Sequence, residues 1–236
     1  MIHRNSILLV ICFSPQLLLA QFERTAGKIV NDNYPGGLFE TVNNPGAKTT
    51  EGSIYLYDQW KTGKISLYMG RVFEDLPVKI NLHDHYLLIQ LPEGENRALR
   101  FDKVKRFDLD DPETGSIESF VNCREFNFSH VTLDGFYRLL YDDSVRLLAY
   151  YELYLQKGNY SQMHDAGNPN DTYYIKKDIY IASHEALSPF NNKRDIRVFA
   201  GSRWDAVNSF MKKNNIRDHS DDDLIKIARY YNSLLK

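Results

Sequence analysis

The sequence predicts a mainly β protein of the α+β kind: an antiparallel β-meander body, barrel- or sandwich-like, followed by a C-terminal pair of amphipathic helices. Three observations support this prediction. The chain has 16 Tyr and 13 Phe among its 236 residues, and aromatic side chains favour pleated, half-buried strands. Short segments in which apolar and polar residues alternate lie between turn-forming residues. Near the C-terminus the apolar spacing changes from two residues to three and four, which is the spacing of a helix.

The first twenty residues have the layout of a secretory signal peptide. A fixed positive charge lies within Met1–Arg4, the apolar run Ile7–Phe13 follows, and the small residue Ala20 stands where a signal peptidase would cut. We therefore expect residues 1–20 to be removed and the mature protein to be exported to the periplasm, the outer-membrane surface or the extracellular space. The apolar run is shorter than the roughly 20 residues that span a bilayer, so no transmembrane segment is expected after cleavage. An uncleaved anchor or a buried N-terminal helix is the alternative.

The composition of the mature chain limits its chemistry. Of 29 basic residues, Arg4 leaves with the signal peptide, so 28 basic residues remain against 31 acidic ones. This near-neutral balance argues against a nucleic-acid partner, which requires a basic surplus or stripe. Cys12 leaves as well, and Cys123 then has no partner for an internal disulfide. We expect Cys123 to be a small buried apolar residue, with a reactive or intermolecular thiol as the alternative.

Residues 21–51 and 52–190 differ in composition and in the pattern of their apolar residues. The first range is rich in Asn, Gly, Pro and Thr without a periodic apolar pattern, which predicts a loosely structured leader. The second range is expected to be an antiparallel β domain. Its clearest element is a hairpin from Phe136 to Leu155, in which Asp142-Asp143-Ser144 forms the turn. The other expected strands are Lys64–Tyr68, Val78–Leu82, Tyr86–Gln90, Leu99–Val104, Val104–Leu109, Ile117–Asn122, Arg124–Phe128 and Thr172–Ile181, with Met69-Gly70-Arg71 as a hairpin connection.

Residues 191–236 are expected to form two helices that pack on the β domain. Ser202 is predicted to cap the first, and Ser220 to cap the second, where three acidic residues favour the positive end of the helix dipole. Each helix has one apolar face, made by Trp204, Val207 and Met211 in the first and by Leu224, Ile227, Tyr231 and Leu234 in the second. These faces require a partner, and the sheet is the large apolar surface that this chain offers; a separate protein is the alternative.

Several segments together resemble a group of secreted, uncharacterised proteins that is widespread in Bacteroidota. The segments are GSIYLYDQW (52–60), GKISL (63–67), RVFEDLPVKINL (71–82), FDKVKRF (101–107), GFYRLLY (135–141), VRLL (145–148) and DLIKIARYYNSL (223–234). The resemblance covers most of the mature chain in the same order. It implies an exported, cell-envelope location and a β body with a C-terminal helical pair, and it carries no catalytic motif because the group has no established activity.

His83 and His85 are the candidate metal ligands. On a strand, residues two apart project from the same face, so the two imidazoles could share a metal with a third ligand from elsewhere. They also lie at an expected turn, where polar side chains face water. The alternative to a metal site is therefore a solvated hairpin tip, and no cofactor is predicted.

Trp60, Tyr150 and Tyr154 are the candidate ligand-binding residues. Aromatic rings provide flat surfaces on which sugars or peptides can stack, and alternation places Tyr150 and Tyr154 on one face of their strand. The alternative is that these rings pack in the core or in cross-strand pairs. The sequence leaves both possibilities open.

The sequence favours a non-enzymatic binding or interaction module of the cell envelope. The Gly-x-Ser-x-Gly pattern of a serine nucleophile and the glycine-rich phosphate loops do not occur in it, and no catalytic residue is predicted. The expected partner is an envelope protein or glycan. The alternative is a hydrolase of envelope glycans or peptides, because the 31 acidic residues offer many carboxylate pairs of the kind that glycosidases use.

Overall fold

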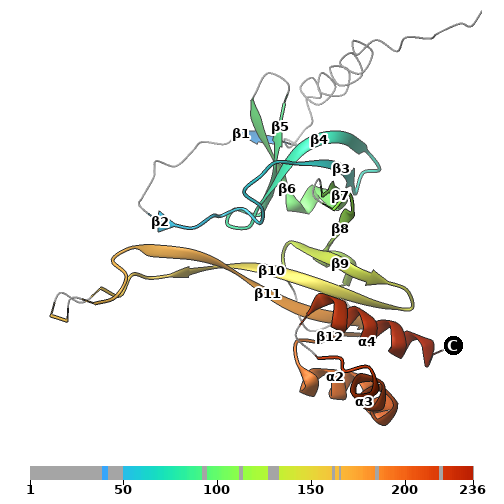
Figure 1. Cartoon of the computed structure of the whole chain (residues 1–236). Coiled ribbons are helices and arrows are strands. Elements are labelled where there is room, and N and C mark those ends of the chain that lie inside the picture. The colour runs from blue at the N-terminus through green and yellow to red at the C-terminus, as the bar shows by residue number, and fades with distance from the viewer. Residues whose placement is uncertain are drawn as a thin grey trace, which may run out of the picture. The chain divides into compact units, whose positions relative to one another are not determined.

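The computed structural model describes residues 39–41, 50–91, 95–111, 114–126, 133–160, 163–164, 166–183, 186–217 and 220–235 (Figure 1). The predicted signal peptide, residues 1–20, lies outside the described residues. Of the predicted leader, the structure describes two short strands, β1 (Phe39–Thr41) and β2 (Thr50–Glu51).

The described strands form one large, mostly antiparallel open sheet. Eleven of them follow one another in the order β1-β6-β5-β4-β3-β7-β8-β9-β10-β11-β12, and β2 pairs in parallel with β11. The predicted mainly β class, with C-terminal helices, is confirmed. Beyond β1 and β2 the strands are β3 (Lys61–Leu67), β4 (Val72–Asn81), β5 (Tyr86–Gln90), β6 (Asn96–Arg100), β7 (Val104–Asp110), β8 (Ile117–Asn122), β9 (Phe136–Asp142), β10 (Val145–Gln156), β11 (Asp171–Ser183) and β12 (Ala186–Pro189).

Two meanders make up this sheet, and they meet where β3 pairs with β7. The connection from β6 to β7 is only the 3₁₀ turn η1 (Phe101–Lys103). In a flat sheet β6 and β7 would lie four strand spacings apart, about 19 Å, whereas four Cα–Cα steps reach about 15 Å when fully extended. Strands β3 to β7 therefore curl towards each other in a barrel-like manner. Asn122 stabilises the connection through η1, because its buried Nδ2 donates to the carbonyl oxygens of Phe101 and Val104 at 3.0 and 2.8 Å.

The second meander contains the predicted hairpin. β9 and β10 pair around a turn at Asp143 and Ser144, and β10 then pairs with β11 along its whole length. The expected strand Leu99–Val104 is wrong over Phe101–Lys103, which form η1, the turn that Asn122 holds through its hydrogen bonds to Phe101 and Val104. A second expected strand is wrong as well: residues Cys123–Phe126 form a 3₁₀ helix, η2, in place of a strand from Arg124. The physical reason is a local hydrogen bond, because the Oδ1 of Asn122 accepts the backbone N–H of Arg124 at 3.0 Å and turns the chain.

The C-terminal helices are α2 (Lys193–Ala200), α3 (Trp204–Lys213) and α4 (Asp221–Ser233), with the 3₁₀ turn η3 (Gly201–Arg203) joining the first two. Helix α2 extends the predicted first helix backwards. Its cap is Asn192, whose side chain accepts the N–H groups of Arg194 and Asp195, so the predicted cap at Ser202 is wrong. The cap at Ser220 is confirmed, since its Oγ accepts the N–H of Asp223 at 3.2 Å.

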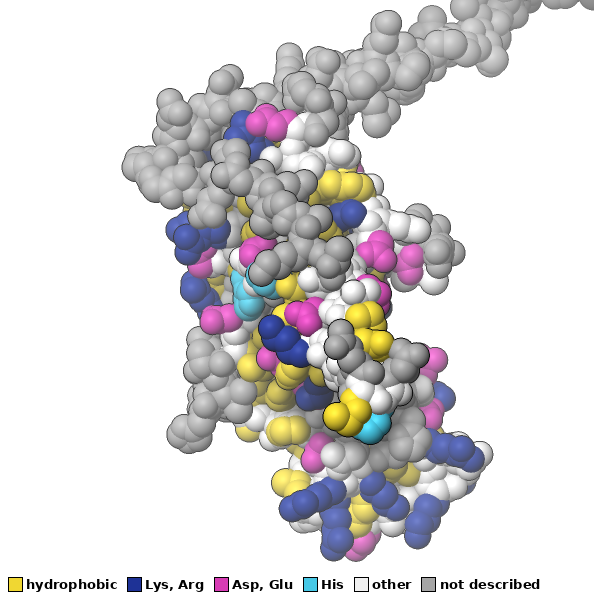
Figure 2. All heavy atoms as spheres, turned by 90° about the vertical axis from the view of Figure 1, so that its left-hand side faces the viewer, with side chains coloured by type: hydrophobic (Ala, Val, Ile, Leu, Met, Phe, Trp, Pro, Cys, Tyr) yellow, Lys and Arg dark blue, Asp and Glu magenta, His cyan; other side chains and the backbone are white. Residues whose placement is uncertain are grey.

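The outer faces of α2 and α3 carry many basic side chains, with Val198 as an exposed apolar one. Lys and Arg side chains gather over these helices, towards the lower end of the view in Figure 2. No described helix has the length and apolar character needed to cross a membrane.

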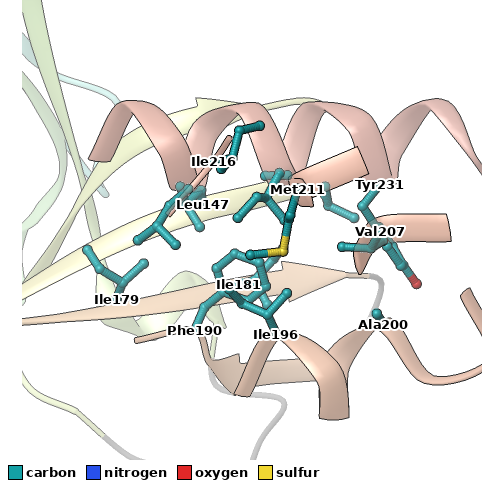
Figure 3. Packing of buried hydrophobic residues seen from close by; sticks show 14 of the residues in the cluster. Leu147, Ile179, Ile181, Phe190, Ile196, Ala200, Val207, Met211, Ile216 and Tyr231 are labelled. Atoms are coloured by element: carbon teal, nitrogen blue, oxygen red, sulfur yellow. The ribbon is translucent and has the colours of Figure 1, made fainter. Parts of the chain in front are cut away.

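The inner faces of the helices pack on β10 and β11 and on Phe190, which follows β12 (Figure 3). Leu147, Ile179 and Ile181 from the strands meet Ile196, Val207 and Met211 from α2 and α3, and Leu224, Ile227 and Tyr231 from α4 join the same buried cluster. The predicted apolar faces are therefore confirmed, and their partner in this chain is the sheet. Burying this surface is the main stabilising contribution of the tail.

Candidate functional site

A hollow of about 280 Å³ lies between the end of β4, the β4–β5 turn and the second half of β10. Most of the residues that line it are aliphatic or aromatic, among them Leu56, Leu82, Tyr151, Leu153 and Tyr173, and His83 also borders it. We call it the apolar hollow. Concave sites with mainly apolar walls and a few polar groups are typical of small-molecule binding sites.

Residues 50–57 close one side of the apolar hollow. This segment begins in β2, which pairs with the start of β11, and it ends beside β4, where Leu56 N–H donates to the carbonyl oxygen of Ile80 at 3.0 Å. Gly52 allows the segment to run close to β11. Its φ is 85°, and a Cβ at this position would lie 2.4 Å from the carbonyl oxygen of Tyr173. Only glycine tolerates both conditions without a backbone shift.

His83 and His85 lie in the turn between β4 and β5 and both line the apolar hollow. The buried Asn81 shapes this turn, because its Oδ1 accepts the backbone N–H groups of His83 and Asp84 at 2.9 and 2.8 Å. The Nδ1 of His83 lies 2.7 Å from the Oδ1 of Asp84. Within the described ranges no three His, Cys, Asp or Glu side chains come close enough to hold a metal ion.

The two imidazole rings have different neighbours. The His83 ring packs edge-on against Tyr173, with centroids 6.0 Å apart, and the His85 ring lies 5.7 Å from Phe101. The residues are in a turn, so the strand geometry that would aim both rings at one ion does not apply to them. What the turn provides is two polar groups at the edge of the apolar hollow.

The structure does not bring the three predicted aromatic residues together. Tyr150 is buried, lines the apolar hollow and donates its hydroxyl to the carbonyl oxygen of Asp134 at 2.9 Å. Tyr154 stacks on Tyr174 across the β10–β11 hairpin, with centroids 5.4 Å apart. Trp60 lies away from the apolar hollow, with the Lys79 ammonium 5.4 Å from its ring. This arrangement corresponds to the core and cross-strand alternative for the two tyrosines.

A charged network lies next to the apolar hollow. Glu118 is 7 % exposed, and its two carboxylate oxygens are taken by Lys61 at 2.8 Å and Arg138 at 2.7 Å. The Lys61 ammonium lies 3.9 Å from the centroid of the Tyr57 ring. The guanidinium of Arg138 donates to the hydroxyl of Tyr151 at 3.5 Å, and Tyr151 also lines the hollow.

Burial keeps the potential nucleophiles of this region protonated. It raises the pKa of the Tyr57 hydroxyl, and the neighbouring Glu118 raises it further. Burial also raises the pKa of the Cys123 thiol, and Asp134 adds to the effect. Cys123 is buried, as predicted from its being unpaired. A thiol that is buried and protonated is a poor nucleophile.

A second, more polar hollow of about 450 Å³ adjoins the first and shares four residues with it, His85, Phe101, Asp134 and Gly135. Charged side chains of both signs line it, among them Arg100, Asp102 and Arg124. Burial acts to raise the pKa of Asp102, but hydrogen bonds from Arg100 and Lys103 outweigh it and lower the pKa. We call this the polar hollow. The two hollows together place apolar walls beside charged groups.

Sequence reasoning missed most residues of this site. Leu56, Leu153 and Tyr173 look like ordinary strand residues, and no motif marks them. The turn glycine at 52 and the acidic residue at 118, which interrupts an apolar strand pattern, are the two signals that point towards it. Comparison of the chain with known protein families, curated proteins and solved structures gives no match.

Proposed function

We propose that this protein is an exported, non-enzymatic binding module of the cell envelope that holds a small amphiphilic ligand. The observation that carries the proposal is the junction of the two hollows. An aromatic or aliphatic body fits the apolar hollow beside Leu82, Leu153 and Tyr173, and a charged or polar end fits among Arg100 and Arg124 in the polar hollow. Sites of this kind bind through apolar contact and select through a few polar groups.

The interactions of two carboxylates near the apolar hollow, those of Glu118 and Glu152, support binding over turnover by these two groups. A general acid or base must be able to reach the substrate proton, whereas both oxygens of Glu118 are occupied by Lys61 and Arg138. Glu152 borders the apolar hollow, and its Oε2 accepts the hydroxyl of Tyr154 at 2.5 Å.

A titration with 1-anilinonaphthalene-8-sulfonate, which has an aromatic body and an anionic end, tests the proposed ligand class. We expect backbone NMR shifts centred on Leu56, Leu82 and Leu153. Leu153→Trp fills the apolar hollow and should weaken binding about tenfold, which corresponds to about 1.4 kcal/mol. The matched control is Ile117→Trp, because Ile117 is 67 % exposed and does not line either hollow; it should bind as the unmodified protein does.

Three results would contradict the proposal: shifts that map elsewhere, equal binding by both Trp variants, or release of products from peptidoglycan or peptide substrates. The last result would favour the hydrolase alternative.

The proposed export is tested separately, by the intact mass of the protein made with its own N-terminus in a bacterium that has a periplasm. A mass beginning at Gln21 supports it, and a mass that retains residues 1–20 contradicts it.

A further inference from the structure

The outer face of α2 has an unusual composition. In a helix successive residues are rotated by about 100°, so Lys193, Arg197, Arg194 and Val198 follow one another around one continuous exposed arc. All four side chains are exposed. Beyond the Lys193 edge of this arc the helix is buried, at Ala200 and Ile196. We call this arc, together with the adjoining Trp204, the basic face.

Positive charge is concentrated at this end of the chain. Residues 193–217 contain seven basic and two acidic residues, a net charge of +5, while the whole chain carries −2. The basic residues are Lys193, Arg194, Arg197, Arg203, Lys212, Lys213 and Arg217. Figure 2 shows the resulting gathering of Lys and Arg side chains over α2 and α3.

Within the part of the chain that the structure describes, no carboxylate neutralises the charges of the basic face. Across the described ranges, Lys193, Arg194 and Arg197 make no ion pair with a carboxylate. Asp195, the nearest acid, is used at the helix start, where its Oδ2 accepts the N–H of Asn191 and the side-chain amide of Asn192. A surface of this kind attracts an anionic partner.

The apolar members of the basic face indicate which anionic partner fits. Val198 is 74 % exposed and lies beside Arg194 and Arg197. The half-buried Trp204 has the Lys193 ammonium and the Arg197 guanidinium each 6.0 Å from its ring centroid. A phosphate backbone offers no apolar surface for Val198, whereas the headgroup region of a bilayer accepts cations, an indole ring and a protruding aliphatic side chain together.

We propose that the basic face of α2 docks on anionic phospholipid membranes, with Val198 entering the headgroup region and Lys193, Arg194 and Arg197 contacting lipid phosphates. This docking surface is separate from the two hollows, and it does not depend on the ligand proposed for them. Its net effect is to hold the protein at a membrane surface.

Flotation with phosphatidylcholine vesicles, with and without about 30 mol % phosphatidylglycerol, tests this docking, because binding to anionic lipid adds about 1 kcal/mol for each Lys or Arg at the surface. The mature chain should float with the anionic vesicles and not with the neutral ones, and binding should weaken between about 0.1 and 0.5 M salt. Arg194→Gln with Arg197→Gln should weaken partitioning about 30-fold, which corresponds to about 2 kcal/mol.

The matched control removes two lysines elsewhere, Lys105→Gln with Lys157→Gln. Both side chains are more than half exposed, so the loss of charge is the same and the fold is not at risk. This variant should bind within about twofold of the unmodified protein. Val198→Gln keeps all charges and should weaken partitioning about fivefold through lost apolar contact.

The proposal is overturned if neutral and anionic vesicles bind alike, if both double-Gln variants lose the same affinity, or if Val198→Gln has no effect. A single-stranded oligonucleotide that binds more tightly than the anionic vesicles at the same salt would also overturn it, in favour of a nucleic-acid partner. Thermal unfolding of each variant shows whether the helices remain packed, so that a loss of binding can be assigned to the surface.

Discussion

Removing the Glu118 carboxylate should destabilise the protein strongly. Glu118 is 7 % exposed and lies within 3 Å of two cations, Lys61 at 12 % and Arg138 at 29 % exposure. Taking one partner from a buried ion pair typically costs about 3–5 kcal/mol, because the remaining charge is left without compensation. Since Arg138 reaches solvent, we expect the lower end, about 3 kcal/mol, for Glu118→Gln. In a protein of this size that lowers Tm by about 6–12 °C.

Urea unfolding followed by circular dichroism measures this loss. The control is the same substitution in an exposed pair, Glu74→Gln, whose carboxylate lies 2.6 Å from Lys64 with both side chains more than half exposed; there we expect less than about 1 kcal/mol. Replacing Glu118, Lys61 and Arg138 together by Leu, Met and Met should restore most of the stability. A loss below about 1 kcal/mol for Glu118→Gln would refute the reasoning, because the two cations would then need no carboxylate.

Three further predictions follow from the described geometry. Cys123 should react with a thiol reagent only as fast as the protein unfolds, and rapid labelling of the native protein would contradict its burial. Gly52→Ala should lower the free energy of unfolding by about 1–2 kcal/mol, because its φ of 85° and the nearby Tyr173 carbonyl exclude a Cβ; unchanged urea unfolding would contradict this. The Arg217 N–H, followed by Lys226, lowers the pKa of Asp223, so this carboxylate stabilises above about pH 4 and its contribution is lost as the pH falls further. Asp223→Asn should therefore flatten the acid limb of the Tm–pH profile, and an identical limb would contradict the assignment.

The sequence predicted those elements whose signals are local. The hairpin of β9 and β10 follows from the turn at Asp142 to Ser144 between aromatic strands, and the start of α4 follows from Ser220 with its acidic neighbours. Helix α2 has a comparable signal at Asn192, with Ile196, Phe199 and Ala200 at three- and four-residue steps, but the prediction began the first helix at Ser202 and missed it.

Long-range pairing could not be predicted in this way. The pairing of β7 with β3 depends on contacts between segments about forty residues apart in sequence. The alternation of apolar and polar residues along a strand does not indicate which other strand is its neighbour. The 3₁₀ helix after β8 depends on a single side-chain hydrogen bond from Asn122. The candidate site is the hardest part to predict from the sequence, because its walls are apolar residues that a sequence pattern does not distinguish from core residues.

One segment connects the hollow with the stability of the fold. Residues 50–57 close the apolar hollow through Leu56 and reach the charged network through Tyr57, whose ring centroid lies 3.9 Å from the Lys61 ammonium. A ligand in the hollow would bind only the folded chain with this segment in place, so it should raise Tm in proportion to the logarithm of its concentration. Gly52→Ala displaces the segment near its start, and it should therefore reduce both the basal stability and the ligand-induced increment. Glu118→Gln is expected to reduce the basal stability while leaving Leu56, Leu82 and Leu153 around the hollow, so the increment should persist. If the ligand-induced rise in Tm differs between the two variants in this way, the hollow is a binding site; if it does not, the hollow is only a gap in the packing.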